Sequence, residues 1–231
     1  MWMHTPEANF SENNLSIELI IFDCDGVLVD SELISNTVMS ETLTTIGPPT
    51  SYEECLELFL GHSWRDCLKI IEDRTQKIMP DDFYDKYMEK VFTRFEKELK
   101  PVKGIEKALD NIFCKFCVAS SGPHEKINKT LTITGLIEKF KGNIFSAEDV
   151  KRGKPHPDLF LHAASEMDAS ASHTIVVEDS NAGVKAGVAA GMTVLAYNPH
   201  SGVSDQFTTE GVFVFESMDH LPKLIRDIQR T

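Results

Sequence analysis

Residues 19–27 read LIIFDCDGV, and this stretch decides the fold expected for the whole chain. Its apolar run ends abruptly in Asp23 and Asp25, which are one residue apart and are followed by Gly26. Side chains alternate faces along a strand, so the two carboxylates would point the same way if the strand continued. Like charges that close repel unless a cation or a shared proton intervenes. The stretch therefore predicts a buried strand that ends in a solvated Asp-x-Asp turn or in a functional pair of acids.

The composition of the chain excludes several classes of partner. A formal net charge of -13 disfavours non-specific binding to nucleic acid or to an anionic membrane. No apolar stretch approaches the roughly 18 residues of a membrane span, and the N-terminus has no signal-peptide pattern. The five cysteines are odd in number and scattered, as in proteins of a reducing cytosol. We therefore expect a cytoplasmic protein that binds neither nucleic acid nor a membrane. We also expect it to be a monomer.

Short apolar runs alternate with amphipathic helical stretches over much of the chain. The predicted strands are 17–22, 115–119, 143–146, 174–177, 192–197 and 211–215. The predicted helices among them are 125–134, 157–167 and 181–190. Nearly all-apolar strands that alternate with helices are typical of a parallel sheet with helices on both faces. We therefore expect an α/β fold with a Rossmann-like parallel core.

Residues 31–98 interrupt this alternation with helices alone. The helices predicted there are 32–46, 52–60, 64–73 and 81–98. An insert after the first strand would lie at the carboxyl edge of the sheet, where ligands bind in open α/β folds. The expected organisation is a disordered tail (1–16), a core (17–30 and 99–231) and a helical insert (31–98).

Three further polar clusters follow predicted strands. Residues 120–123 (SSGP) place hydroxyls and backbone N–H groups before a helix, which suits an oxyanion or a phosphate. Lys154 is fixed between a glycine and a proline, and Glu178 and Asp179 end another strand. Taken singly, these clusters also fit a plain turn, a solvated lysine and a helix N-cap. Taken together with the first pair of acids, they suit Mg²⁺ and a phosphoryl group.

In their order along the chain, these motifs resemble those of the haloacid dehalogenase-like superfamily, in its phosphatase branch. The four motifs are DCDGV at 23–27, Ser120, Lys154 and the pair at 178–179. The resemblance covers residues 17–231 and implies a phosphoric monoester hydrolase in which the insert is a cap. This cap resembles those of β-phosphoglucomutase and of phosphoglycolate and sugar-phosphate phosphatases.

The resemblance assigns roles to the core residues. It implies that Asp23 is the nucleophile and forms an aspartyl-phosphate, while Asp25 protonates the leaving oxygen and then activates water. Ser120 and Lys154 would bind the transferring phosphoryl group.

A Mg²⁺ cofactor is also implied. Its expected ligands are Asp23, the backbone carbonyl of Asp25 and Asp179, with Glu178 close by.

Substrate contacts are expected from Ser121 and Gly122 and from the cap residues His62, Trp64 and Arg65. The cap loop that contains these three residues matches the substrate-contacting loop of the subgroup. Packing in the cap core is the alternative for Trp64, and a solvated helix position is the alternative for Arg65.

Three other functions are alternatives to the hydrolysis of phosphate esters. Asp25 argues against a dehalogenase, because a departing halide needs no proton. A β-phosphoglucomutase-like phosphotransferase is the main alternative. Its cap histidine and cap-loop arginine correspond here to Ser35 and Trp64, which favours hydrolysis. A non-catalytic phosphometabolite-binding protein is disfavoured by the intact set of four motifs. The substrate stays open among sugar phosphates, phosphogluconate and phosphoglycolate.

Overall fold

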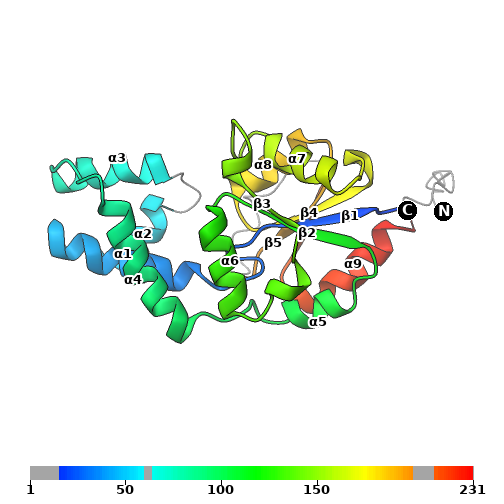
Figure 1. The fold of residues 1–231 in the computed structure, drawn as a ribbon, viewed down its shortest axis with the longest axis horizontal. Helices are drawn as coiled ribbons and strands as arrows, with labels where there is room; N and C mark the ends of the chain where they lie inside the picture. The colour runs from blue at the N-terminus through cyan, green and yellow to red at the C-terminus, as the bar shows by residue number, and fades with distance from the viewer. Residues whose placement is uncertain (1–15, 60–63, 200–210, 231) are drawn as a thin grey trace, which may run out of the picture.

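The computed structural model describes residues 16–59, 64–199 and 211–230. Six strands form one sheet in the order β3-β2-β1-β4-β5-β6, and every neighbouring pair is parallel (Figure 1). The strands are β1 (Leu19–Phe22), β2 (Lys115–Ser120), β3 (Ile144–Ser146), β4 (Thr174–Glu178), β5 (Thr193–Tyr197) and β6 (Val212–Phe215). The parallel α/β sheet and all six strands predicted from the sequence are thereby confirmed.

Strand β1 lies inside the sheet and is buried on both faces. Ile20 and Phe22 pack into one hydrophobic layer. Leu19 and Ile21 pack into the opposite layer, and all four side chains are fully buried. A strand covered on both faces must be apolar at every position, which explains why the run carries no alternating polar residues.

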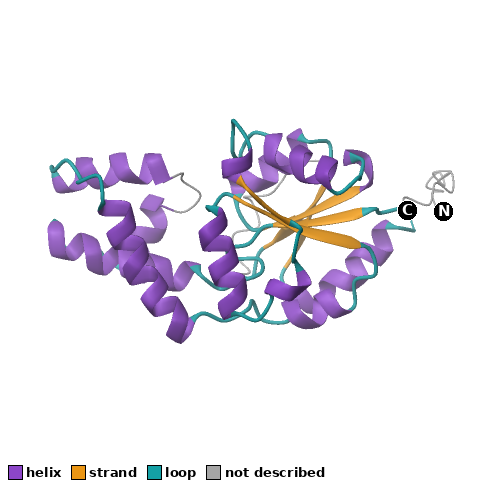
Figure 2. Cartoon of the chain, viewed as in Figure 1, coloured by secondary structure: helices purple, strands orange, loops and turns teal. Residues whose placement is uncertain are grey.

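Helices cover the two faces of the sheet (Figure 2). The core helices are α5 (Ile105–Asp110), α6 (His124–Ile133), α7 (Asp158–Glu166), α8 (Asn181–Ala189) and α9 (Leu221–Ile228). Short 3₁₀ turns are η1 (Ile137–Lys139), η2 (Ala147–Asp149), η3 (Ala171–His173) and η5 (Met218–His220). The predicted helices match α6, α7 and α8, whereas α5 and α9 were not predicted. Among the described helices, none combines the length and the apolar character needed to cross a membrane.

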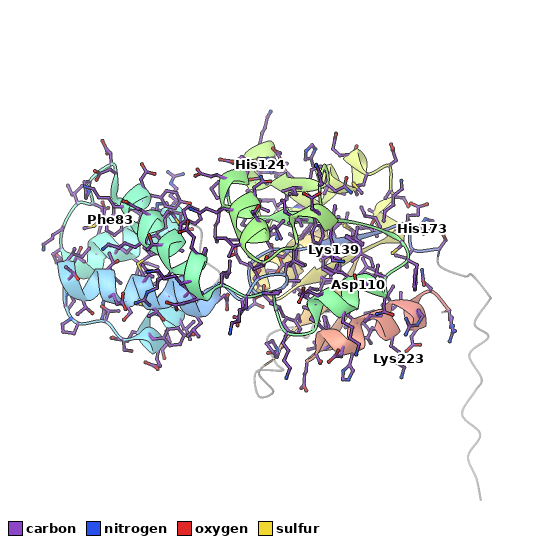
Figure 3. The ribbon with its side chains drawn as sticks, turned by 60° about the horizontal axis from the view of Figure 1, so that its bottom comes forward. Phe83, Asp110, His124, Lys139, His173 and Lys223 are labelled. Carbon is purple, nitrogen blue, oxygen red and sulfur yellow. The ribbon has the colours of Figure 1, made fainter. Side chains whose placement is uncertain are left out.

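The insert predicted after the first strand is all-helical over the residues that the structure describes. It contains α1 (Glu32–Ile46), α2 (Tyr52–Phe59), α3 (Trp64–Thr75) and α4 (Phe83–Glu98). Its buried residues include Cys55, Ile71 and Phe95, whose side chains pack between the helices. Figure 3 shows labelled Phe83 in this insert, well apart from Asp110 and Lys139, which form an ion pair of 2.5 Å in the core.

Two adjacent linkers join the insert to the core. The N–H of Asp30 donates to the carbonyl of Lys100 (3.0 Å), and the N–H of Val102 donates to the carbonyl of Leu28 (2.9 Å). These bonds make the outgoing and returning chains run antiparallel beside each other. The insert therefore leaves and re-enters the core at one place, next to the end of β1.

Close packing between α8 and β5 generates a prediction about stability. A Cβ at Gly187 would lie 2.7 Å from Cγ2 of Val194. We expect Gly187→Ala to lower the free energy of unfolding by about 1–3 kcal/mol, because the added methyl overpacks this contact. Helix propensity alone would favour alanine by about 1 kcal/mol, so a loss has to come from packing. Urea-induced unfolding measures the change.

A double-mutant cycle identifies the contact responsible. In a Val194→Ala background the clashing methyl is absent, so Gly187→Ala should there cost much less than in the wild type. Equal costs in both backgrounds would place the strain elsewhere.

Candidate active site

The predicted motifs meet at the carboxyl edge of the sheet. Asp23 follows β1 directly, Ser120 is the last residue of β2, and Glu178 is the last residue of β4. Lys154 reaches the same edge from the loop between η2 and α7. Because parallel strands all end at one edge, residues far apart in the sequence come within hydrogen-bonding distance there.

Lys154 lies at the centre of this cluster, and only 3% of its side chain is exposed. Its Nζ donates to Asp23 Oδ1 (2.5 Å) and to Glu178 Oε1 (2.6 Å). A third bond goes to the backbone carbonyl of Ala119 (3.0 Å). Burial lowers the pKa of Lys154, but the two carboxylates outweigh burial and raise the pKa above its usual value. The ammonium is therefore charged at neutral pH.

Glu178 is fully buried and held by several donors. Its Oε2 accepts from the N–H of Asp179 (3.0 Å), the N–H of Ser180 (2.9 Å) and the hydroxyl of Ser180 (2.9 Å). A Cβ at Gly183 would lie 1.8 Å from Glu178 Oε1, so glycine is required at the start of α8. The residues after β4 therefore fix this carboxylate in one orientation.

Asp23, Glu178 and Asp179 form a compact acidic group whose carboxylate oxygens lie within 4.8 Å of one another. Burial raises the pKa of Asp23 to about 7, against the opposing effect of Lys154. Burial and the neighbouring carboxylates also raise the pKa of Asp179 well above its usual value. One ammonium cannot neutralise three carboxylates that lie this close together, two of them buried, so the group favours an additional cation.

The donor atoms and their surroundings fit a hard divalent cation. All three side chains offer carboxylate oxygens, which Mg²⁺ prefers. Gly26 has a positive φ of 75°, and a Cβ there would lie 1.8 Å from Asp179 Oδ2. Only glycine lets the loop after β1 approach Asp179 so closely. This group could therefore hold a metal ion.

Asp25 has different partners from Asp23. Ser31 Oγ donates to its Oδ1 (2.5 Å), and Lys126 Nζ donates to its Oδ2 (2.7 Å). Burial raises the pKa of Asp25, but Lys126, Ser31 and Lys154 together outweigh burial, and the pKa is lowered from its usual value. Ser31 immediately precedes α1, so Asp25 contacts both the core and the start of the insert.

Lys126 is the site residue that the sequence analysis missed. It lies on α6 next to the buried Ile127, and the sequence carries another lysine one turn later, at Lys129. Nothing in this pattern distinguishes the lysine that pairs with Asp25 from an ordinary surface lysine. The available signal is positional, because Lys126 lies in the first turn of the helix that follows Ser120.

The loop after β2 is held in place by its own hydrogen bonds. Ser120 is buried, and its Oγ accepts from the N–H of Gly122 (3.1 Å). The carbonyl of Gly122 accepts from Ser146 Oγ (2.7 Å). Ser121 between them is exposed. Ser120 and Gly122 therefore lie at the carboxyl edge of the sheet, where residues that follow a strand are expected. Ser121 is open to solvent.

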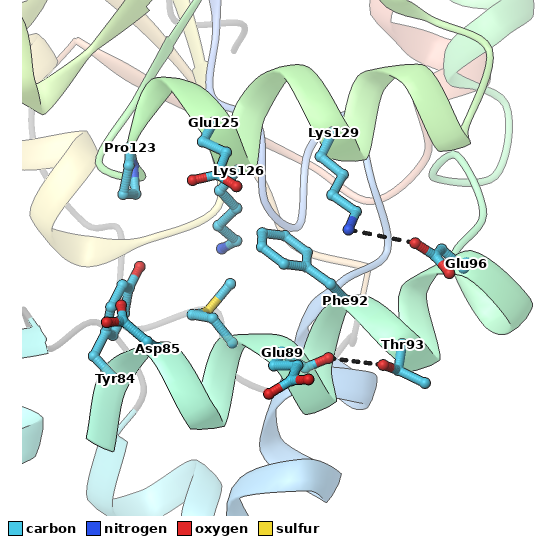
Figure 4. A pocket seen from close by; sticks show the side chains of 11 residues that line it. Tyr84, Asp85, Glu89, Phe92, Thr93, Glu96, Pro123, Glu125, Lys126 and Lys129 are labelled. Carbon is cyan, nitrogen blue, oxygen red and sulfur yellow. Dashed lines mark hydrogen bonds and ion pairs between the residues drawn. The ribbon is translucent and has the colours of Figure 1, made fainter. Parts of the chain in front are cut away.

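A cavity of about 360 Å³ opens between α4 of the insert and α6 of the core (Figure 4). Its lining residues are Tyr84, Asp85, Met88, Glu89, Phe92, Thr93, Glu96, Pro123, Glu125, Lys126 and Lys129. Lys126 belongs both to this lining and to the ion pair with Asp25. The cavity and that carboxylate therefore share one lysine, although Asp25 itself is not among the lining residues.

The three insert residues predicted to contact substrate lie in different surroundings. His62 lies outside the described residues. Trp64 stacks on Tyr87 (centroids 5.5 Å apart) and meets Tyr84 edge-on (4.8 Å), so it packs in the aromatic core of the insert. Arg65 is exposed on the first turn of α3, and it is not among the described residues that line the cavity. Its contact with substrate stays a prediction.

Comparisons with known proteins agree over most of the chain. A sequence model of the haloacid dehalogenase-like hydrolases matches residues 20–197. A 6-phosphogluconate phosphatase of Escherichia coli K12 is 31% identical over 213 residues, which are 90% of this chain and 94% of that protein. A phosphorylated carbohydrates phosphatase of Thermotoga maritima is 28% identical over 180 residues, which are 76% of this chain and 82% of that protein.

A solved structure extends the comparison to the fold. A haloacid dehalogenase-like protein of Agrobacterium tumefaciens has a TM-score of 0.80 and 36% identity, over 92% of this chain and 99% of that one. The match spans both the sheet and the helical insert.

The buried ion pairs of Lys154 lead to a prediction about stability. Lys154→Met should lower the free energy of unfolding by about 3–5 kcal/mol, because Asp23 and Glu178 would stay buried without their cation. Urea-induced unfolding in the presence of EDTA measures the loss. The double variant Lys154→Met/Glu178→Gln is the matched comparison and should recover part of it, since one uncompensated charge is removed. A loss below about 1 kcal/mol, typical of exposed pairs, would contradict the reasoning.

Proposed function

The chain belongs to the haloacid dehalogenase-like hydrolases. We propose that the site at the carboxyl edge of its sheet hydrolyses phosphate monoesters of small sugars or sugar acids through an aspartyl-phosphate. The observation that carries the proposal is the pairing of buried Asp23 with Lys154 beside a second, differently partnered acid, Asp25. The two phosphatases compared above support the substrate class, since both are named for phosphorylated carbohydrates or phosphogluconate.

In this proposal Asp23 is the nucleophile. Lys154 holds Asp23 Oδ1, which orients the carboxylate at the end of β1. A carboxylate oxygen attacks phosphorus, the bond between phosphorus and the ester oxygen breaks, and that oxygen leaves with a proton from Asp25. Lys154 and Ser120 bind the transferring phosphoryl group, and the positive charge of Lys154 offsets part of its negative charge. The result is a phosphorylated Asp23 and a free alcohol.

Asp25 acts in both halves of the reaction. Lys126 helps to keep it charged in the free site. A phosphate dianion bound beside Asp25 would raise its proton affinity, so Asp25 takes up a proton from solvent before it gives one to the leaving oxygen. After the alcohol leaves, the Asp25 carboxylate takes a proton from water as the water oxygen attacks phosphorus. The bond between phosphorus and Asp23 breaks, which releases inorganic phosphate and restores the carboxylate.

Mg²⁺ is the proposed cofactor. Asp23, Asp179 and the backbone carbonyl of Asp25 would hold it, while Glu178 supports the site from the β4 end. When bound, it would supply positive charge that allows an anionic nucleophile to approach an anionic phosphate. Residues 31–98 are proposed to act as a cap that covers the site and limits substrates to small molecules.

Replacement of the nucleophile tests this assignment. Asp23→Asn should reduce release of phosphate to less than about one hundredth of the wild-type rate, since an amide cannot form the acyl phosphate. A panel of phosphorylated metabolites and p-nitrophenyl phosphate provides the assay, with circular dichroism to verify folding. The same substitution at exposed Asp81 is the matched control and should retain activity. Activity of Asp23→Asn above that limit would remove Asp23 from the mechanism.

Metal removal tests the cofactor. Dialysis against EDTA should abolish activity, and Mg²⁺ should restore it better than Ca²⁺, whose longer bonds and higher coordination would displace the nucleophile. Asp179→Asn should raise the Mg²⁺ concentration needed for half-maximal activity, because it removes one anionic ligand. Full activity after chelation would show that the acidic group works without a metal.

A further inference from the structure

The cavity between α4 and α6 lies next to Lys126, the lysine that pairs with the proposed acid Asp25. In the proposed reaction, on which this inference rests, Asp25 gives its proton to the ester oxygen, so the leaving group begins at Asp25. Lys126 Nζ lies 2.7 Å from Asp25 Oδ2 and also lines the cavity. Pro123, another lining residue, directly follows the loop at 120–122. Lys126 and Pro123 therefore connect the cavity to the proposed phosphoryl-binding edge.

The charge of this cavity is set by its acidic residues. Its four acidic lining residues are Asp85, Glu89, Glu96 and Glu125. Its two lysines already have partners: Lys126 pairs with Asp25, and Lys129 lies 3.3 Å from Glu96 Oε1. Figure 4 shows both lysines pointing from α6 toward α4. Among the described lining residues, no cation is left over to receive an anionic group.

The remaining chemistry of the lining suits hydroxyl groups. Carboxylates such as Asp85 and Glu89 accept hydrogen bonds from hydroxyls but repel another carboxylate. Met88 and Phe92 offer apolar surface to the C–H face of a carbon chain. The volume of about 360 Å³ lies within the range of pockets for small ligands.

We infer that this cavity binds the leaving group and that its charge selects a neutral, polyhydroxylated alcohol over one that carries a carboxylate. The specificity-determining residues are Asp85 and Glu89 of α4, which lie one turn apart on the face that looks toward α6. This narrows the proposed substrate class to phosphates of sugars or polyols and disfavours phosphates of sugar acids.

Two substrates that differ in one group test the inference. Sorbitol 6-phosphate and 6-phosphogluconate have the same carbon chain and phosphate position, but one ends in a hydroxymethyl group and the other in a carboxylate. We expect kcat/KM to favour sorbitol 6-phosphate by at least about tenfold, as repulsion between like charges in a binding site requires. A wild-type preference for 6-phosphogluconate would overturn the inference.

A charge reversal then tests the assigned residues. Glu89→Lys should shift the ratio of the two kcat/KM values toward 6-phosphogluconate by at least about fivefold, and Glu89→Gln should shift it less in the same direction. Glu98→Lys is the matched control, because it makes the same charge change on α4 outside the cavity and should leave the ratio unchanged. If the wild type and both Glu89 variants gave the same ratio, the charge on α4 would not determine which substrate is preferred.

A third substrate separates this inference from the proposed function. Hydrolysis of p-nitrophenyl phosphate by the wild-type protein reports the phosphatase chemistry without a polyol leaving group. Release of phosphate from this compound together with an inverted preference between the two six-carbon substrates would overturn only the inference. No release from any of the three would overturn the proposed function.

Discussion

Lys154 bonds at once to groups at the ends of three neighbouring strands: Asp23 after β1, Ala119 in β2 and Glu178 in β4. A buried ammonium and buried carboxylates are each costly in isolation and are tolerated only together. The interaction that aligns the strand ends is thus the same one that places the proposed nucleophile. Fold and site cannot be separated at this point, because every other motif residue takes its position relative to these strands.

The two acids of the first motif show how small differences in surroundings produce different chemistry. Asp23 faces Lys154 and two more carboxylates, and burial raises its pKa to about 7. Asp25 faces Lys126 and Ser31, and its pKa is lowered. Separate environments for two neighbouring carboxylates are the usual way in which one site obtains two distinct roles. At Asp23 burial and the neighbouring Glu178 outweigh Lys154, whereas at Asp25 Lys126 and Ser31 help to outweigh burial.

Much of this arrangement could be predicted from the sequence, for a physical reason. Buried parallel strands are apolar at nearly every position, so runs such as 174–177 stand out, and the polar residues that end them mark the carboxyl edge. Helices α5 and α9 were missed for different reasons. The six residues of α5 are too few to show a helical period, whereas the amphipathic pattern of α9 from Leu221 to Ile228 does indicate a helix.

Other features could not be obtained from the sequence because they depend on packing between segments. The pairing of Lys126 with Asp25 joins residues on two separate elements and leaves no local pattern. The sequence left Trp64 open between substrate contact and packing; the structure shows its stacking on Tyr87 of α4, and its contact with substrate stays a prediction. The cavity likewise exists only because the insert and the core lie side by side.

The paired linkers give the insert an unusual independence from the rest of the chain. Because the N–H of Asp30 donates to the carbonyl of Lys100, the two points at which the core is interrupted are already hydrogen-bonded neighbours. A segment of any length whose ends are equally close could occupy this place without changing the connectivity of the sheet. The architecture is therefore modular: recombination could exchange the helices of the insert, and with them the lining contributed by α4, while the catalytic edge was inherited, provided that the hydroxyl of Ser31 on Asp25 was kept.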